Sequence, residues 1–195
     1  MAREITVVSD FVCPYCFWLE ALMERLPEPP PVRYAPYQLT RRGEAQVDVA
    51  ADPERRARYA QTLAPACEAL GLEMHLPPRV SPRPYTDLAF QGWYFARAQG
   101  AGDAFYERVF RAYFQEERDI GDIGVLCALA QDVGLDAPAL RRALEDGTYA
   151  RAVEQDTDET ASRLEICMVP TLVCGAHRLE GFVPDVETLR SWLEE

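Results

Sequence analysis

The 195-residue sequence contains no lysine and no asparagine, and it has only two histidines, His75 and His177. The missing lysine excludes Schiff-base chemistry and a P-loop, because both need that side chain. Positive charge is also in deficit: 20 basic residues, all arginine, stand against 32 acidic ones and give a net charge of −12. A chain this acidic repels a phosphate backbone, so we expect no nucleic-acid partner.

Long apolar runs are absent too. No stretch reaches the roughly 20 apolar residues that a membrane-spanning helix needs, so we expect no membrane partner. Residues 1–8 lack the charged start, the apolar run and the small-residue cleavage site of a secretory signal. The sequence therefore predicts a cytoplasmic protein, in which structural disulfides are rare and paired cysteines are usually catalytic or bind metal.

Six cysteines are the main reactive groups that this composition leaves. The length and the 48% hydrophobic content suit one domain, or one domain with an insertion, and not a small disulfide-stabilised scaffold. Two of the cysteines, Cys13 and Cys16, lie three positions apart. The other four are isolated in the sequence: Cys67, Cys127, Cys167 and Cys174.

The first forty residues predict a βαβ unit. Residues 5–8 are rich in β-branched side chains, and residues 13–25 place apolar side chains at helical spacing. Residues 32–39 then alternate as a second strand. Strand, helix and strand in this order are the unit from which a parallel pair is built.

The rest of the chain predicts an insertion and a return to the sheet. Helical patterns fill the region from about residue 53 to 165, and a β-hairpin over residues 171–180 is followed by a final helix. We therefore expect an α/β sheet domain, residues 1–45 plus 166–195, interrupted by an inserted all-α helical domain, residues 46–165.

Cys13-Pro14-Tyr15-Cys16 directly follows the first predicted strand, where the next helix begins. A C-x-x-C pair beside a βαβ unit is the signature of a thioredoxin-like redox site. The free N–H groups and the dipole of a helix N-terminus favour an anion, so Cys13 should be the attacking thiolate. Cys16, inside the first turn, is placed to resolve a mixed disulfide on Cys13.

A zinc site is the alternative explanation of this motif, because C-x-x-C also opens zinc ribbons. Two further ligands would be required, yet no second C-x-x-C exists, and His75 and His177 are isolated. The sequence therefore favours redox chemistry and predicts no metal.

A second feature is Val169-Pro170-Thr171, in which a proline begins the returning strand. Taken alone, it is explained equally well as a strand-initiating proline. Together with the residues from Asp10 to Cys16 and the helical insertion, however, it resembles the DsbA-like thioredoxin-fold proteins, most closely the FrnE-type branch. The resemblance spans nearly the whole chain.

This resemblance implies a thioredoxin fold with an inserted helical domain, and thiol–disulfide exchange on protein or peptide substrates. It also implies that the Val169–Pro170 bond is cis and that the backbone of residue 169 lies beside the two sulfurs. Val169, Pro170, Pro14 and Tyr15 would then bind the substrate.

The resemblance implies no bound cofactor, because a redox-active Cys13–Cys16 disulfide carries the electrons itself. A cellular reductant, either glutathione or a thioredoxin system, would regenerate the dithiol. The alternative is a glutathione-dependent isomerase or transferase of the 2-hydroxychromene-2-carboxylate isomerase type, which resembles the same fold. Such enzymes usually carry serine where Cys13 stands, and Cys16 would have no function in them.

Two departures from the family pattern concern protons and charge. Thioredoxin and DsbA proteins carry a buried acid six residues before the first cysteine, and this position is Val7 here. Either Asp10 or a water molecule therefore assists proton transfer from Cys16, or no group does. The dipeptide is Pro-Tyr where DsbA has Pro-His, so no imidazolium can stabilise Cys13.

The remaining cysteines and aromatic residues have simpler interpretations. Cys67 and Cys127 lie on apolar helical faces, where free cysteine usually packs as a small buried hydrophobe. Cys167 and Cys174 flank Pro170 and are also expected to be buried, with a second redox pair or an approach to Cys13 as the alternatives. The aromatic side chains of residues 93–114 are expected to form the core of the insertion, with a peptide-binding groove as the alternative.

Overall fold

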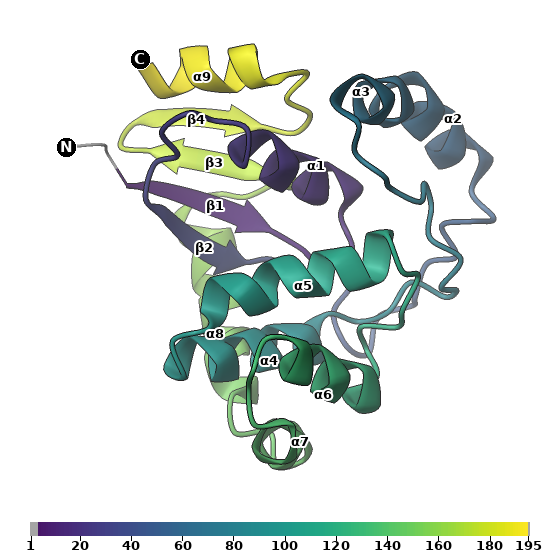
Figure 1. Cartoon of the computed structure of the whole chain (residues 1–195), viewed down its shortest axis with the longest axis vertical. Helices are drawn as coiled ribbons and strands as arrows, with labels where there is room; N and C mark the ends of the chain where they lie inside the picture. Colours follow the sequence, from purple (N-terminus) through teal and green to yellow (C-terminus); the bar gives the residue numbers. More distant parts are fainter. Residues whose placement is uncertain (1–3, 195) are drawn as a thin grey trace.

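The computed structural model describes residues 4–194 and contains a four-stranded sheet in the order β2-β1-β3-β4 (Figure 1). The central strand β1 pairs in parallel with β2 and antiparallel with β3, which pairs antiparallel with β4. The strands are β1 Ile5–Ser9, β2 Val32–Pro36, β3 Thr171–Cys174 and β4 His177–Glu180. The first and last parts of the sequence therefore share one sheet.

Helices α1 (Pro14–Met23) and α9 (Val186–Glu194) pack against one face of this sheet. Alternate β1 side chains, Ile5 and Val7, join apolar residues of both helices in a buried cluster, as expected of a strand in which successive side chains point to opposite faces. The indole N–H of Trp18 on α1 donates to a backbone carbonyl near the start of α9, that of Val183, at 2.6 Å.

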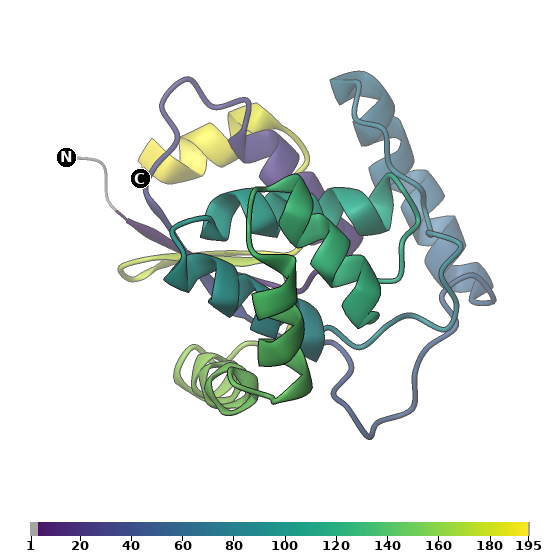
Figure 2. The same cartoon turned by 60° about the horizontal axis from the view of Figure 1, so that its bottom comes forward.

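Seven helices separate β2 from β3, which confirms the thioredoxin fold with a helical insertion. They are α2 Pro53–Gln61, α3 Leu63–Leu70, α4 Asp87–Ala98, α5 Gly102–Phe114, α6 Ile123–Asp132, α7 Ala137–Glu145 and α8 Ala150–Arg163. Helices α4 to α7 pack on one another, and α8 returns along the edge strand β2. Figures 1 and 2 both show α2 and α3 on the side of the molecule opposite α8.

The inserted helices are joined to the sheet through buried aromatic rings. Phe17 on α1 stacks on Phe110 and Phe114 of α5, with ring centroids 5.7 and 5.5 Å apart. Phe11, just after β1, packs against Phe90 of α4, with ring centroids 4.7 Å apart. The expectation that the aromatic residues form a core is therefore confirmed. Among the described residues, the large hydrophobic side chains that are exposed are Leu39 and Met168, so the structure gives no support to an aromatic groove.

Two local features differ from the sequence pattern. The strand expected over residues 32–39 ends at Pro36, and the N–H of Leu39 donates to the carboxylate of Asp10 instead of to a neighbouring strand. The apolar pattern from Tyr59 to Leu70 is divided between two helices, because the backbone leaves helical geometry at Thr62. Among residues 4–194, no helix has the length and apolar character to cross a membrane.

A half-buried acid on α1, Glu20, is paired with a tyrosine of β2. The hydroxyl of Tyr34 donates to Oε2 of Glu20 at 2.6 Å, and the other carboxyl oxygen, Oε1, has no partner. Burial raises the pKa of Glu20 to about 8, and the nearby acids Glu24, Glu107 and Asp103 raise it as well. The folded protein therefore holds Glu20 in its neutral form at neutral pH.

The stability of the protein should decrease as the pH rises from about 4.5 to about 8, because over this range the unfolded chain ionises Glu20 whereas the folded protein keeps it protonated. Glu20→Gln keeps a neutral acceptor for Tyr34 and should remove this loss. We expect the free energy of unfolding of the variant, relative to the wild type, to increase with pH by at most about 1.4 kcal/mol per pH unit. Urea titrations between pH 5 and pH 8 measure this, with the exposed Glu28→Gln as control. Parallel pH profiles for wild type and Glu20→Gln would contradict the prediction.

Candidate active site

The two cysteines of the C-x-x-C motif lie at the start of α1. Cys13 is the N-cap residue, in an extended conformation, and Pro14 opens the helix. The N–H of Cys16 donates to the carbonyl of Cys13 at 3.0 Å, which closes the first turn. Both thiols are free, and both residues are buried, Cys13 with 4% and Cys16 with 0% of its surface exposed.

The returning strand brings the Val169–Pro170 bond to the same place. Val8 at the end of β1 pairs with Thr171 at the start of β3, so the residues just before Thr171 lie beside the turn that leads to Cys13. The Val169–Pro170 bond is cis, as the resemblance implied. Sγ of Cys13 lies 3.5 Å from the carbonyl oxygen of Val169. The backbone directly before Pro170 therefore contacts the first sulfur.

Tyr15 of the motif connects the active-site helix to the α2–α3 segment, in which Thr62 alone separates the two helices. The hydroxyl of Thr62 donates to the carbonyl of Arg58 at 2.8 Å, which leaves its oxygen to accept from the Tyr15 hydroxyl at 3.1 Å. The Tyr15 ring also meets the rings of Tyr59 and Phe182 edge-on, with ring centroids 6.0 and 5.7 Å apart. The α2–α3 segment therefore packs on the start of α1, where Cys13 is buried. Nothing in the sequence pattern assigned Tyr59, Thr62 or Phe182 to the site.

Burial is the main influence on the second thiol. It raises the pKa of Cys16 well above the usual value of a cysteine, and the neighbouring Cys13 and the charge of Asp10 raise it further. Cys16 therefore stays protonated at neutral pH unless a nearby base takes its proton. The chemistry of the pair depends on where that proton can go.

Asp10 is the buried acid of the site, fully enclosed three residues before Cys13. The N–H of Leu39 donates to its Oδ2 at 2.7 Å, while Oδ1 has no partner. Burial raises the pKa of Asp10 to about 6, against the lowering influence of the hydrogen bond from Leu39, of the Thr86 side chain and of the positive charge of Arg83. At neutral pH Asp10 is therefore mostly a carboxylate, able to accept a proton.

The structure separates the remaining cysteines into two kinds. Cys67 and Cys127 are buried, as expected. The expectation of burial was wrong for Cys167, which is exposed, and for Cys174, which is half-buried. Glu165, with a φ of 48°, turns the chain in the loop after α8, and Cys167 lies on that exposed loop. β3 carries Cys174 about 13 Å along the strand from Pro170, given about 3.3 Å per residue.

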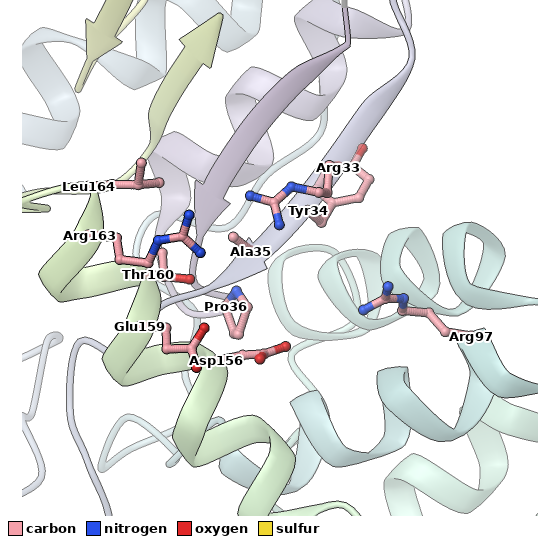
Figure 3. Close-up of a pocket in the computed structure, with 10 residues that line it drawn as sticks. All are labelled: Arg33, Tyr34, Ala35, Pro36, Arg97, Asp156, Glu159, Thr160, Arg163 and Leu164. Carbon is pink, nitrogen blue, oxygen red and sulfur yellow. The ribbon is translucent and has the colours of Figure 1, made fainter. Parts of the chain in front are cut away.

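Neither a metal-binding cluster nor the cavity beside β2 extends the site in the described part of the chain. In residues 4–194 no three His, Cys, Asp or Glu side chains gather closely enough to hold a metal ion. A cavity of about 150 Å³ lies between β2 and α8 (Figure 3). It contains no thiol, and its charged walls carry both signs: Arg33, Arg97, Arg163, Asp156 and Glu159. The candidate active site therefore remains at the start of α1.

A central strand leading to a C-x-x-C helix, with a cis proline at the start of the next antiparallel strand, defines a thioredoxin-fold protein. The chain belongs to the family of DSBA-like thioredoxin domains, which it matches over residues 4–194. This family contains thiol oxidoreductases that act on disulfides, so the fold and the family agree with the chemistry expected of the motif.

Comparisons with individual proteins extend this assignment. The chain is 38% identical over 183 residues to YwbO of Bacillus subtilis (strain 168), described as uncharacterized, and covers 91% of that protein. A probable DsbA oxidoreductase from Streptomyces coelicolor superposes with a TM-score of 0.80 at 23% identity, over 98% of this chain and 89% of that one.

Two further solved structures share the fold at a TM-score of 0.70. One is the cytosolic disulfide reductase DsbM from Pseudomonas aeruginosa with GSH, at 19% identity and over 98% and 97% of the two chains. The other is a 2-hydroxychromene-2-carboxylate isomerase, at 17% identity and over 96% and 91%. Identities this low show a common fold, and the equal scores do not separate the two chemistries.

Loosening the α2–α3 segment should expose the first thiol. Tyr15→Phe and Thr62→Val each remove the hydrogen bond between α1 and this segment, which is worth about 0.5–1.5 kcal/mol. We expect Cys13 to react roughly 2- to 10-fold faster with a bulky maleimide. Mass spectrometry of the labelled peptides measures this, with buried Cys127 as the internal reference. Unchanged labelling of Cys13 in both variants would show that the α2–α3 segment does not limit access.

Proposed function

We propose that the protein is a thiol–disulfide oxidoreductase that acts on protein or peptide substrates through Cys13 and Cys16. The observation that carries this proposal is the position of Cys13, at the start of α1 with its sulfur 3.5 Å from the Val169 carbonyl. A helix N-terminus favours the thiolate that attacks a disulfide. The backbone of Val169 is at the same time placed to hold an extended substrate across that sulfur.

The reduction proceeds in two exchanges. The Cys13 thiolate attacks one sulfur of the substrate disulfide, forming a Cys13–substrate bond and releasing the other sulfur as a thiolate. Cys16 then gives up its proton and attacks the Cys13 sulfur. The bond between Cys13 and the substrate breaks, and the second substrate sulfur leaves as a thiolate. Two electrons have then passed from the protein to the substrate, which is reduced to a dithiol, while the protein is oxidised to a Cys13–Cys16 disulfide. Run in reverse, the same steps oxidise a substrate dithiol.

Asp10 supplies the base for the second exchange. Its carboxylate is close enough to raise the pKa of Cys16, and its Oδ1 has no partner. A carboxyl group with a pKa of about 6 is ionised at pH 7 and yet basic enough to take part in proton transfer. Asp10 thus takes the role of the acid that is missing at Val7.

The partners follow from this chemistry. No bound cofactor or metal is needed, because the Cys13–Cys16 pair carries the electrons, and glutathione or a thioredoxin system would return the disulfide to the dithiol. The similarity to a cytosolic disulfide reductase with GSH supports a glutathione reductant and a cytoplasmic location. The net charge of −12 argues against a nucleic-acid partner.

Substitution of each cysteine in turn should separate the two exchanges. Cys13→Ser removes the attacking thiol, so reduction of a disulfide protein such as insulin by glutathione should fall to the uncatalysed rate. Cys16→Ala keeps the attack and removes the resolution, so a mixed disulfide on Cys13 should accumulate. Non-reducing electrophoresis and mass spectrometry detect it, and Cys127→Ala serves as a control that leaves both steps intact.

The same variants test the isomerase alternative. An enzyme that only activates bound glutathione needs no thiol at position 16, so Cys16→Ala would retain full isomerase turnover and trap no substrate. That outcome would overturn the proposal, as would persistent reductase activity in Cys13→Ser.

A further inference from the structure

Arg83 is a buried cation with no ion-pair partner. It lies in the loop between α3 and α4 and is 7% exposed. Among residues 4–194 no carboxylate oxygen comes within 4 Å of its guanidinium nitrogens. Arginine is almost never buried without a partner, because removal of its charge from water is costly. A buried position this unusual needs a compensating negative charge nearby.

Three hydrogen bonds fix this residue from the loop that follows β2. Its N–H donates to the carbonyl of Val47 at 2.9 Å, and its own carbonyl accepts from the Gln46 side chain at 3.0 Å. One guanidinium nitrogen donates to the hydroxyl of Thr40 at 2.6 Å. Thr40 is itself buried and follows Leu39, whose N–H binds Asp10. The loop therefore holds both Arg83 and the carboxylate.

Asp10 is the buried anion next to this cation in the structure of the loop, because the consecutive residues Leu39 and Thr40 hold Asp10 and Arg83 respectively. In agreement with this, the positive charge of Arg83 lowers the pKa of Asp10. Three buried atoms of these side chains and of Thr86 lack partners, namely Oδ1 of Asp10, Nε of Arg83 and Oγ1 of Thr86. Buried polar atoms of this kind are usually satisfied by an enclosed water molecule.

We propose that Arg83 is a positioning residue for the proton step of the exchange. Its guanidinium, buried and held by Thr40 next to the residue that binds Asp10, keeps that carboxyl group in the charged form that accepts the proton of Cys16. The inference rests on the proposed function, because it concerns the second exchange at the same site. It explains why a cation is buried here although the reaction centre itself contains only thiols and a carboxyl group.

The charges that act around Asp10 make this assignment specific. The titratable groups coupled to it electrostatically are Cys16 from α1, to which Cys13 is coupled in turn, Tyr113 from α5 and Arg83 from the loop before α4. Of these, Arg83 alone is positive. Loss of its charge should therefore raise the pKa of Asp10, so that the carboxylate becomes available only at higher pH.

A chromogenic disulfide measures the proton step directly. Dithiobis(nitrobenzoate) reacts with Cys13, releases one nitrothiobenzoate and leaves a second on the Cys13 sulfur. Attack by Cys16, with transfer of its proton to Asp10, forms the Cys13–Cys16 bond and releases the second. The rate of this second release is followed by stopped-flow between pH 4.5 and 8, in a background carrying Cys167→Ser and Cys174→Ser.

We expect the acid limb of this pH profile to move up by roughly 1 pH unit in Arg83→Gln, and to stay near the wild-type position in Arg83→Lys. Asp10→Asn should remove the limb. Arg42→Gln is the matched control, because Arg42 belongs to the same region but is exposed and paired with Asp87. A rate that falls equally at every pH in Arg83→Gln would show a purely structural role and overturn the inference.

Two further outcomes keep the inference and the proposed function apart. Release of a single equivalent by the wild type would mean that Cys16 does not resolve the disulfide, and the proposed function would fail. Two equivalents with an unshifted Arg83→Gln profile would overturn the role of Arg83 alone. Should Arg83→Gln not fold, Thr40→Val frees the guanidinium from its anchor, and an unmoved acid limb there would equally overturn the proposal.

Discussion

The burial of Asp10 is the constraint on which the rest of the site depends. Its backbone carbonyl accepts from the N–H of Cys13 at 3.0 Å, and its carboxylate accepts from the N–H of Leu39. Through these bonds one residue joins the end of β1, the start of α1 and the loop after β2. A carboxyl group can occupy this position only because polar groups from three separate segments surround it, since an uncompensated charge would be too costly in the interior.

Desolvation is the strongest influence on the pKa values of the ionisable groups in this region, and hydrogen bonds and nearby charges decide how far each pKa rises. Burial raises the pKa of Asp10, Cys16 and Glu20 alike. The hydrogen bond from Leu39, the Thr86 side chain and the positive charge of Arg83 lower the pKa of Asp10. For Glu20 only the hydrogen bond from Tyr34 lowers the pKa, and three neighbouring acids raise it. The same fold therefore contains one carboxyl group with a pKa below neutral pH, that of Asp10, and one with a pKa above it, that of Glu20.

The parts of this site that sequence patterns could locate are those defined by their immediate neighbours. The spacing of Cys13 and Cys16 is itself the spacing of one helical turn, whereas Pro170 is assigned to the site only through the family resemblance. Tyr59, Thr62 and Arg83 lie in loops and short helices far from the motif in sequence, and only tertiary packing brings them to it. Cys167 illustrates the same limit, because it was expected to be buried while the turn after α8 exposes it.

The pairing of Val8 with Thr171 has a consequence for the order in which the molecule is built. Contacts between residues so distant in sequence form slowly and late, because the intervening chain must first be ordered. On the ribosome, Cys13 is synthesised 156 residues before Val169. A nascent chain thus has both thiols long before it has the segment that contacts them, and the redox site is completed only after the whole helical insertion has been made.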